Sequence, residues 1–580
     1  MEEYASPPSS PSSSDLAQTV RNSYDHLPEL TWRTFIAVIV FSCIVTRITT
    51  GLQSRRRKPS NEEPQSVKIV PYWLPWIGHG LSLTWDHVTS VCKARNSAKE
   101  SVFGLLMGGV RQNVVVSPSI TKTILSSPDA SSAAVTAYVI ENVFGDTGAI
   151  HRLKPEDSRA FHETAIMREP FITKALTAEL GLIERETPNL VTFCRSIVDQ
   201  APWERASQVT VDDYDTEVRT CEANLFSLVK DFIGYLSVSL FMGSAFTESF
   251  FSQLEDLWTM ENRIISLLTG APRWLPSPGV SAAHPARRRL LEVFSAFHQA
   301  FIAWDDGRDP GMELRDLEDV SEPIKERIRI SRKLGLSSGA SAPGHLSQFW
   351  ALLRNTPKVV FWNLLHIYAD PKLLEDIRKE ISPYAKATRV SREETGFPFQ
   401  EPPKLSIDLK GIIECCPLFK ACYYETIRLE SAGVSFRKLT SDLNLTESDK
   451  DAAIDGLTSP RTYRLQKGDY IAISHGAHQK DDRYFHNPGQ YDPQRFIHRD
   501  SETGETKVDS RTITPFHDNI FEGKGQHFAE REIFAFTAAI LSLWDIEPVG
   551  EKGWKIPGPK SSVGTFLPLN DVRVKMKMRV

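Results

Sequence analysis

The chain has 580 residues, with 68 basic against 73 acidic side chains, a formal net charge of −5 and 41% hydrophobic residues. This balance is typical of a globular protein and argues against a nucleic-acid binder, which usually carries a strongly basic domain. The seven cysteines are too few and too irregularly spaced for a disulfide framework or a paired zinc site, so no metal site is expected. Length alone allows up to about four domains.

The N-terminal part predicts a polar tail followed by a membrane anchor. Residues 1–30 are rich in Ser and Pro and predict a disordered tail. Residues 31–52 predict an anchor helix, because the stretch from Thr34 to Thr46 carries no charge and lies between Arg33 and Arg47. That stretch is shorter than the roughly 20 residues that span a bilayer. A buried core helix is therefore the alternative.

A basic hinge is expected after the anchor, over residues 53–69, which include the run SRRRKP. Basic residues stay on the cytoplasmic side of a membrane. The predicted location is a membrane that the chain crosses once, with the C-terminal body in the cytosol and the endoplasmic reticulum as the expected membrane.

The body of the chain is mostly helical in pattern up to about residue 430. Gly- and Pro-rich clusters at 270–288 and 333–345 are predicted as loops. Between Phe436 and Ser474, alternating segments such as YRLQKGDYIAIS predict short strands. The expected fold class is mainly α with a small β region near the C-terminus.

Three motifs follow one another in the C-terminal half. ACYYETIRL places Glu425 and Arg428 three residues apart on one helix face, where opposite charges can pair. YDPQRF supplies Arg495, with which a buried Glu–Arg–Arg network could form. The segment from Pro515 to Phe536, PFHDNIFEGKGQHFAEREIFAF, runs from a loop into a helix. In this order the trio resembles the cytochrome P450 superfamily of haem-thiolate monooxygenases.

The resemblance covers nearly the whole chain from Thr34 onward and implies a P450-like domain over residues 70–580, behind the membrane helix. It implies that residues 346–371 form the long central helix that crosses the haem face. Arg437 lies where the family often has a haem-propionate partner. The pattern of Asn355 with the later Phe-Trp pair is similar to the branch that contains prostacyclin synthases and sterol 7α-hydroxylases.

The ligand loop departs from the family pattern Phe-x-x-Gly-x-x-x-Cys-x-Gly-Arg-x-Phe-Ala. Gly523 stands at the cysteine position, and Asn519 and Gln526 replace the expected Gly and Arg. A thiolate ligand favours O–O cleavage on haem iron, whereas glycine has no side chain to offer. No cysteine follows Cys422. We interpret Gly523 as a degenerate haem-ligand position and expect no cofactor, with haem as the alternative.

Two histidines in the same segment, His517 and His527, offer imidazole ligation as another possibility. His517 lies six residues before the ligand position and His527 falls at the start of the helix. These positions favour structural roles for both.

The predicted central helix departs from the family a second time. Its usual acid–Thr pair, which handles oxygen, would fall near Arg354 and Asn355. Arg354 either points outward or pairs with a carboxylate, or it projects into the pocket, where a buried cation needs a partner or an anionic ligand. Pro357 predicts a kink nearby. Arg354 and Asn355 are the catalytic candidates, with Arg354 as a donor that polarises an enal or enone.

Three functions stay open. The first is an enzyme of hydrophobic secondary-metabolite biosynthesis that acts on a terpenoid or polyketide without redox chemistry, as a cyclase or isomerase such as a Diels–Alderase. The second is a haem-dependent monooxygenase with an unusual axial ligand or none. The third is a non-catalytic scaffold for pathway enzymes. The expected partners are a hydrophobic small molecule and the membrane, no nucleic acid, and a reductase only if haem is bound.

Overall fold

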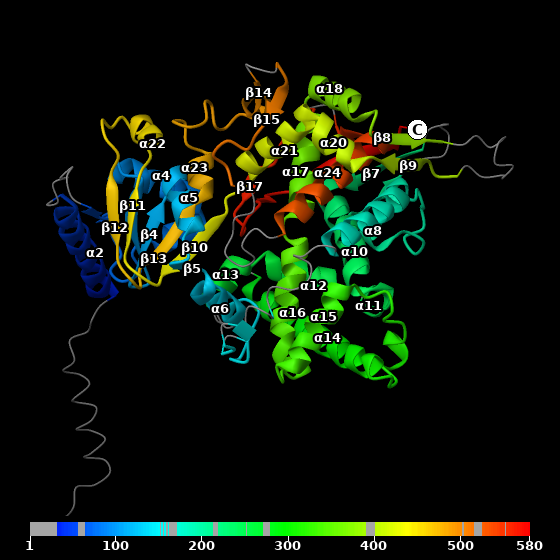
Figure 1. Ribbon diagram of the computed structural model, residues 1–580, viewed down its shortest axis with the longest axis horizontal. Coiled ribbons are helices and arrows are strands. Elements are labelled where there is room, and N and C mark those ends of the chain that lie inside the picture. The colour runs from blue at the N-terminus through cyan, green and yellow to red at the C-terminus, as the bar shows by residue number, and fades with distance from the viewer. Residues whose placement is uncertain are drawn as a thin grey trace, which may run out of the picture.

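The computed structural model describes residues 32–55, 64–150, 152–154, 156–157, 161, 171–212, 219–250, 252–270, 279–389, 401–500, 504–514, 525–550 and 553–579. Helices make up most of it. The largest sheet lies on one side, at the left of Figure 1, and we call that side the β part. The predicted fold class, mainly α with a small β region behind an apolar N-terminal helix, is confirmed.

The α-helices of the described chain fall into one N-terminal helix, short helices around the strands, and a large helical body. They are α2 (Trp32–Arg55), α3 (Gly80–Trp85), α4 (His87–Ala98), α5 (Pro118–Ser126), α6 (Ala133–Asn142), α8 (Phe171–Glu186), α9 (Pro202–Ala206), α10 (Leu225–Met242), α11 (Ser244–Ser249), α12 (Gln253–Glu261), α13 (Ile264–Leu268), α14 (Val280–Asp305), α15 (Glu322–Lys333), α16 (Ser338–Leu353), α17 (Thr356–Ala369), α18 (Pro371–Ile381), α20 (Leu409–Cys415), α21 (Pro417–Glu430), α22 (Asp449–Ile454), α23 (His475–Gln479) and α24 (Gln526–Leu543).

The strands pair into one larger sheet and several small ones. The larger sheet runs in the order β2 (Lys68–Ile69), β3 (Val102–Met107), β4 (Val110–Val115), β13 (Tyr470–Ser474), β10 (Val434–Leu439) and β5 (Ala130–Ser131). The small sheets are β1 (Gln65–Ser66), β12 (Thr462–Leu465) and β11 (Leu443–Thr446); β16 (Trp544–Pro548), β19 (Arg573–Met578), β7 (Thr220–Asn224) and β6 (Thr210–Val211); β14 (Ile497–Arg499) with β15 (Thr506–Val508); β17 (Pro559–Lys560) with β18 (Leu567–Pro568); and β8 (Ala385–Thr388) with β9 (Lys404–Ile407).

The centre of the helical body is a bundle of α8, α10, α17 and α24, against which α21 packs. Nearly every residue of α17, whose sequence is TPKVVFWNLLHIYA, is buried. A helix that is apolar around its whole circumference belongs inside a protein. α17 is therefore the buried axis around which the other helices are arranged. A second core, between α12, α14 and α16, is filled by aromatic rings such as Phe246, Phe294 and Phe349.

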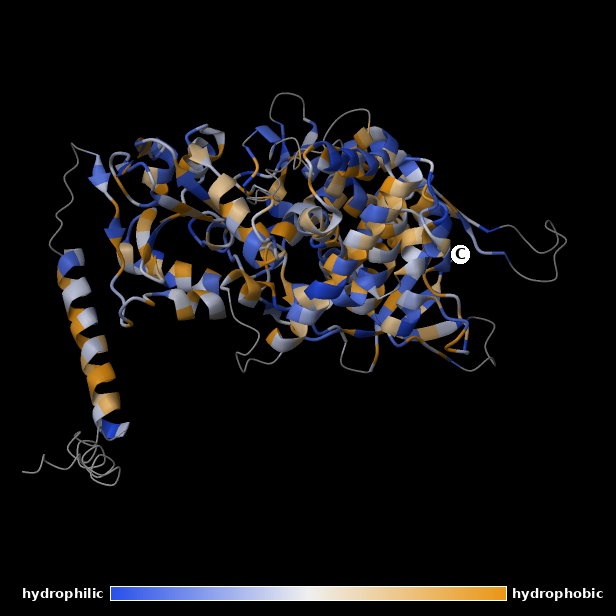
Figure 2. Ribbon diagram, turned by 90° about the horizontal axis from the view of Figure 1, so that it is seen from below, coloured by the Kyte–Doolittle hydropathy of each residue, from blue (hydrophilic) through white to orange (hydrophobic). Residues whose placement is uncertain are grey.

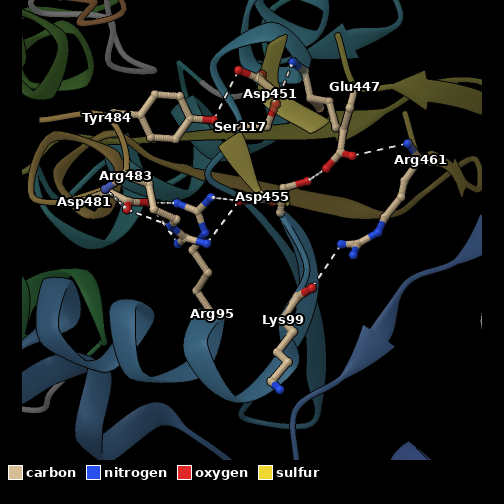
Figure 3. Close-up of polar contacts among 12 residues, drawn as sticks. Arg95, Lys99, Ser117, Glu447, Asp451, Asp455, Arg461, Asp481, Arg483 and Tyr484 are labelled. Carbon is tan, nitrogen blue, oxygen red and sulfur yellow. Dashed lines mark hydrogen bonds and ion pairs between the residues drawn. The ribbon is translucent and has the colours of Figure 1, made fainter. Parts of the chain in front are cut away.

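A buried ionic cluster joins the helix α4 to the β part (Figure 3). Arg95 of α4 donates to Asp481 and lies 3.2 Å from Asp455, the residue that follows α22. Arg483 lies 3.0 Å from Asp455 and 2.9 Å from Asp481. Asp451, inside α22, accepts from Ser117 at 2.7 Å. Because each buried charge has partners, the cluster holds α22 firmly against α4.

Two of the loops predicted from Gly and Pro content are wrong in part. Residues 280–288 belong to α14 and residues 338–345 belong to α16. Each helix contains a proline in its second turn, Pro285 and Pro343, which costs one backbone hydrogen bond but not the helix. Ser337 caps α16 by accepting from the backbone N–H of Ala340.

Two described helices are long and apolar enough to cross a membrane. One of them, α10, is largely buried in the bundle and serves as a core helix. The other, α2, has no part of its apolar window buried and projects from the β part at the left of Figure 2. It covers residues 32–52 of the predicted anchor and continues to Arg55, into the first residues of the predicted hinge. Residues 1–30 and part of the predicted hinge, residues 56–63, lie outside the described chain.

Candidate functional site

Glu425 is the centre of a buried charge network on α21. Its carboxylate accepts from Arg428 at 2.7 and 2.8 Å and from Nε of Arg495 at 3.1 Å. The side chains of Glu425 and Arg428 are fully buried. Arg428 also donates to the backbone carbonyls of Gln479 and Pro488. The structure therefore brings the three motif residues together, where they hold the segment before Arg495 against α21.

The central helix is interrupted at the two residues singled out as catalytic candidates. α16 ends at Leu353 and α17 begins at Thr356, so Arg354 and Asn355 form the junction. Pro357 lies in the first turn of α17, where a missing N–H leaves no intrahelical bond unmade. The helix is thus interrupted just before Pro357, close to where the sequence predicts a kink.

Arg354 lies inside the protein and not at its surface. Its side chain is 3% exposed, and its guanidinium carbon lies 4.4 Å from the centre of the Trp350 ring. Burial lowers the pKa of Arg354 to about 10, while the nearby carboxylate of Glu261 favours the charged form. Arg354 therefore stays positively charged at neutral pH, within the electrostatic reach of a carboxylate.

Glu261, at the end of α12, is the acidic member of a buried group that we call the Glu261 cluster: Glu261, Trp350, Arg354, Lys358 and Ser562. Its carboxylate accepts from Nζ of Lys358 at 2.6 Å, from Ser562 at 3.1 Å and from the indole N–H of Trp350. Burial alone would raise the pKa of Glu261, but Lys358, Trp350 and Arg354 outweigh it and hold the pKa below its usual value.

Asn355 connects the junction to the C-terminal segment Ser562–Phe566. Its Oδ1 accepts from the backbone N–H of Thr565 at 3.3 Å. The segment is also fixed by the indole of Trp362, which donates to the carbonyl of Phe566 at 2.9 Å, and by the backbone N–H of Phe566, which donates to the carbonyl of Glu430 at 2.8 Å. Asn355 thus contacts a segment that reaches the junction from a distant part of the chain, while Arg354 lies over Trp350 of the preceding helical turn.

Sequence reasoning missed two buried acids beside the same junction. Glu532 of α24 accepts from Thr356 at 2.7 Å and from Ser237 of α10 at 3.1 Å. The second acid, Glu179 of α8, lies beside Glu532. Burial first, and then the negative charge of Glu532, raise the pKa of Glu179 well above its usual value. A sequence signal existed for Lys358, a lone cation in the apolar run of α17, but not for these acids.

Three positions of the ligand loop, Gly523, Asn519 and His517, lie outside the described residues. Gln526 and His527 are the first residues of α24. Arg437 lies on β10 with a buried side chain, and it donates to the carbonyl of Phe436. Among the described residues there is no group of three His, Cys, Asp or Glu side chains that could hold a metal ion.

Comparison with known proteins gives the family. The model of the family described as cytochrome P450 matches residues 342–572. The chain is 23% identical to cytochrome P450 monooxygenase poxD of Penicillium oxalicum, over 85% of this chain and 90% of that protein. It is 23% identical to 25-hydroxycholesterol 7-alpha-hydroxylase of Rattus norvegicus over 45% of this chain and 59% of that protein. For the prostacyclin synthase of the same species the identity is 23%, over 45% and 50% of the two chains.

The family match corrects the expectation that the chain has no cofactor. That expectation is wrong, because haem is the cofactor that P450 proteins normally bind. The residues of this chain nevertheless fail to fit the haem-thiolate group in one respect. All seven cysteines precede the ligand loop, and Cys422, the last of them, is buried within α21. The chain belongs to the cytochrome P450 superfamily of enzymes, as a member without a cysteine at the haem-ligand position.

Proposed function

We propose that the chain is a P450-fold enzyme of hydrophobic secondary-metabolite biosynthesis that leaves the oxidation level of its substrate unchanged. The reaction class is cyclisation or isomerisation, and an intramolecular Diels–Alder addition belongs to it. One observation carries the proposal: no cysteine follows Cys422, so the ligand loop has no thiolate with which to promote O–O cleavage. The proposal concerns the reaction and holds whether or not the protein binds haem.

A P450-type interior suits such a reaction because it can hold a flexible apolar substrate in one reactive conformation. Orientation of the reacting atoms can lower a barrier by roughly 7–11 kcal/mol. We assign the polarising role to Arg354, which keeps its positive charge at neutral pH, and a positioning role to Asn355, which links the helix junction to Ser562–Phe566. A fixed cation near a developing oxyanion stabilises the transition state without reorganisation.

The decisive experiment is turnover without oxidants. The purified full chain is incubated with candidate polyene and enone intermediates under argon, without a reductase or nicotinamide cofactor. The expected product is an isomer of unchanged mass, and Arg354→Met should lower its rate of formation about 100- to 1,000-fold, the usual effect of removing one donor to a developing oxyanion. Product that forms only with dioxygen and reductase, and that carries an added oxygen atom, would contradict the proposal.

A spectroscopic comparison tests the observation that carries the proposal. The haem-reconstituted, reduced protein is treated with carbon monoxide, beside the variant Gly523→Cys. We expect the thiolate-type Soret band only in the variant, since only the variant has sulfur at the family's ligand position. The same band in the parent chain would contradict our reading of the ligand loop.

A haem-dependent monooxygenase with an atypical axial ligand is the second candidate. Two observations favour it: the complete network around Glu425, and the relatives that are named monooxygenases. The network also stabilises the fold, so its presence fits both candidates. The mass of the product under air, with a reductase supplied, distinguishes them.

We also propose that α2 anchors the enzyme in the endoplasmic reticulum with the body in the cytosol. Support comes from the apolar helix itself and from the basic run after it. Fluorescence of a tagged full-length chain, compared with a reticulum marker in fungal cells, tests the location, and a diffuse cytosolic signal would contradict it.

A further inference from the structure

Arg327, on α15, is a buried cation that has no role in the proposed reaction. The residue is 0% exposed, and its guanidinium carbon lies 4.2 Å from the centre of the Phe161 ring. Its two terminal nitrogens each donate at 2.8 Å to a backbone carbonyl, one of Phe161 and one of Gly344. Among the described residues, no carboxylate pairs with Arg327 and its Nε–H has no acceptor. A buried cation normally has an anionic partner.

Arg327 keeps its charge at neutral pH, and that charge acts on a neighbouring pair of histidines. Burial lowers the pKa of Arg327 to about 9, which is still above neutrality. Burial first, and then the positive charge of Arg327, lower the pKa of His345 on α16 well below its usual value. Burial lowers the pKa of His298 on α14 to about 4. Both imidazoles are therefore neutral at pH 7, and they do nothing to balance the buried cation.

The two imidazoles contact each other and leave one nitrogen unused. Nδ1 of His298 lies 3.2 Å from Nε2 of His345 and 2.8 Å from the hydroxyl of Ser341. Nε2 of His298 is buried and has no hydrogen-bond partner among the described residues. A neutral imidazole carries its proton on one of its two nitrogens. When Nδ1 accepts from Ser341 or His345, the proton lies on Nε2, which can then donate to a ligand.

A small cavity of about 10 Å³ lies between α10, α14, α15 and α16, and both imidazoles line it. Its other walls are mostly apolar, and of the described residues that line it none belongs to the Glu261 cluster. Arg327 is next to the cavity along two helices. Ile328, which follows it on α15, lines the cavity, and Gly344, whose carbonyl it contacts, directly precedes His345. The volume is about the least that holds one water-sized ligand, and the flexible side chain of Met242 in the wall can adjust to a slightly larger one.

We propose that this cavity binds one small inorganic anion of halide size, which compensates the charge of Arg327 and accepts a hydrogen bond from Nε2 of His298. Charge selects the ligand, because a cation would be repelled by Arg327 and a water molecule would leave that cation unbalanced. Size excludes phosphate and organic acids. The anion then links α14 and α15 to α16, the first half of the interrupted central helix. The proposal does not depend on the reaction that the enzyme catalyses.

The test compares sodium chloride with sodium gluconate, whose anion is too large for the cavity, at constant ionic strength. The full chain in detergent is unfolded by heat while chloride replaces gluconate. A ligand that binds only the folded state raises the Tm, so we expect a saturating rise of about 2 °C. Arg327→Met and His298→Phe should lose most of this rise. Lys333→Met is the matched control, since it removes an exposed cation from the same helix and should keep the rise.

Bromide, which resembles chloride in size and scatters X-rays anomalously, locates the site. Crystals of the full chain soaked in sodium bromide should show an anomalous peak in the cavity, beside Nε2 of His298. Bromide peaks at the surface alone, or an equal rise of the Tm in Arg327→Met and Lys333→Met, would overturn the proposal. A parent Tm that does not depend on chloride would overturn it as well and would assign the cavity to water. If Arg327→Met does not fold, His298→Phe decides, because an undiminished rise in that variant contradicts the role of the imidazole.

Discussion

At the level of single residues, the unusual feature of the helix junction is a charged side chain in the almost fully buried helix α17. Lys358 is 2% exposed, and its ammonium group is compensated by Glu261 at 2.6 Å. Burial lowers the pKa of Lys358, and Glu261 opposes that effect. A buried pair of this kind stabilises little by itself, but removing one partner leaves a charge without compensation.

Lys358→Met should therefore destabilise the protein by about 3–5 kcal/mol, the usual effect of breaking a buried ion pair. The double variant Lys358→Met/Glu261→Gln should recover at least half of the loss, because no carboxylate is then left uncompensated. Denaturant unfolding followed by circular dichroism measures both. Lys372→Met, at an exposed position of α18, is the control. A single variant as stable as the parent chain would contradict this account of the cluster.

At the level of elements, the junction between α16 and α17 is determined by what packs beside it. Gly564 has a φ of 87°, and a Cβ atom there would lie 2.7 Å from Oδ1 of Asn355. The backbone N–H of Ala432 donates to the carbonyl of Gly564 at 2.9 Å, so the segment cannot simply move away. The C-terminal segment therefore requires a glycine where it passes Asn355.

Gly564→Ala should cost about 1–3 kcal/mol, from the unfavourable backbone conformation and the displaced Asn355. It should also lower turnover more than stability alone explains, because Asn355 sits at the proposed site. Gly558→Ala is the control, since a Cβ atom there would have 4.0 Å to its nearest neighbour and φ is not positive. Thermal unfolding and product formation are compared for the two variants. Equal effects would show that the contact with Asn355 is unimportant.

What the sequence could predict follows from how far apart the interacting residues lie. Glu425 and Arg428 are three residues apart, so the helical repeat suffices to pair them, and the strand pattern before Ser474 rests on equally local alternation. Glu261 and Lys358 are 97 residues apart, and nothing local in either segment indicates the pair. Pro285 and Pro343 suggested loops because local propensity cannot register the packing that keeps their helices intact.

At the level of the whole molecule, the cluster around Arg95 connects α4 with the β part (Figure 3). Arg95→Gln should destabilise the protein by about 2–3 kcal/mol, less than the full effect of a broken buried pair, because Arg483 still faces both Asp455 and Asp481. Limited proteolysis should cut near α22 sooner in the variant. Lys93→Gln, at an exposed position of the same helix, is the control and should leave both measurements unchanged.

The stability of the four-helix core, formed by α8, α10, α17 and α24, depends on pH. Glu179 and Glu532 are both buried, and burial raises the pKa of each above its usual value. The folded protein therefore keeps protons that the unfolded chain loses once the pH exceeds about 4.3. Since stability falls with pH wherever the folded state binds more protons, this contribution is fully present below that pH and is lost as the pH rises toward the folded pKa values.

Glu179→Gln should flatten this fall, because the amide cannot ionise and so removes the contribution that Glu179 makes to the pH dependence. Each unit by which folding raises the pKa corresponds to about 1.4 kcal/mol in the free energy of unfolding. The variant should therefore gain stability relative to the parent chain as the pH rises from 5 to 8. Melting temperatures across that range measure the effect, with Glu375→Gln at an exposed site of α18 as the control. Parallel curves for Glu179→Gln and the parent would mean that Glu179 is already ionised in the folded protein across this pH range, which would contradict a raised pKa.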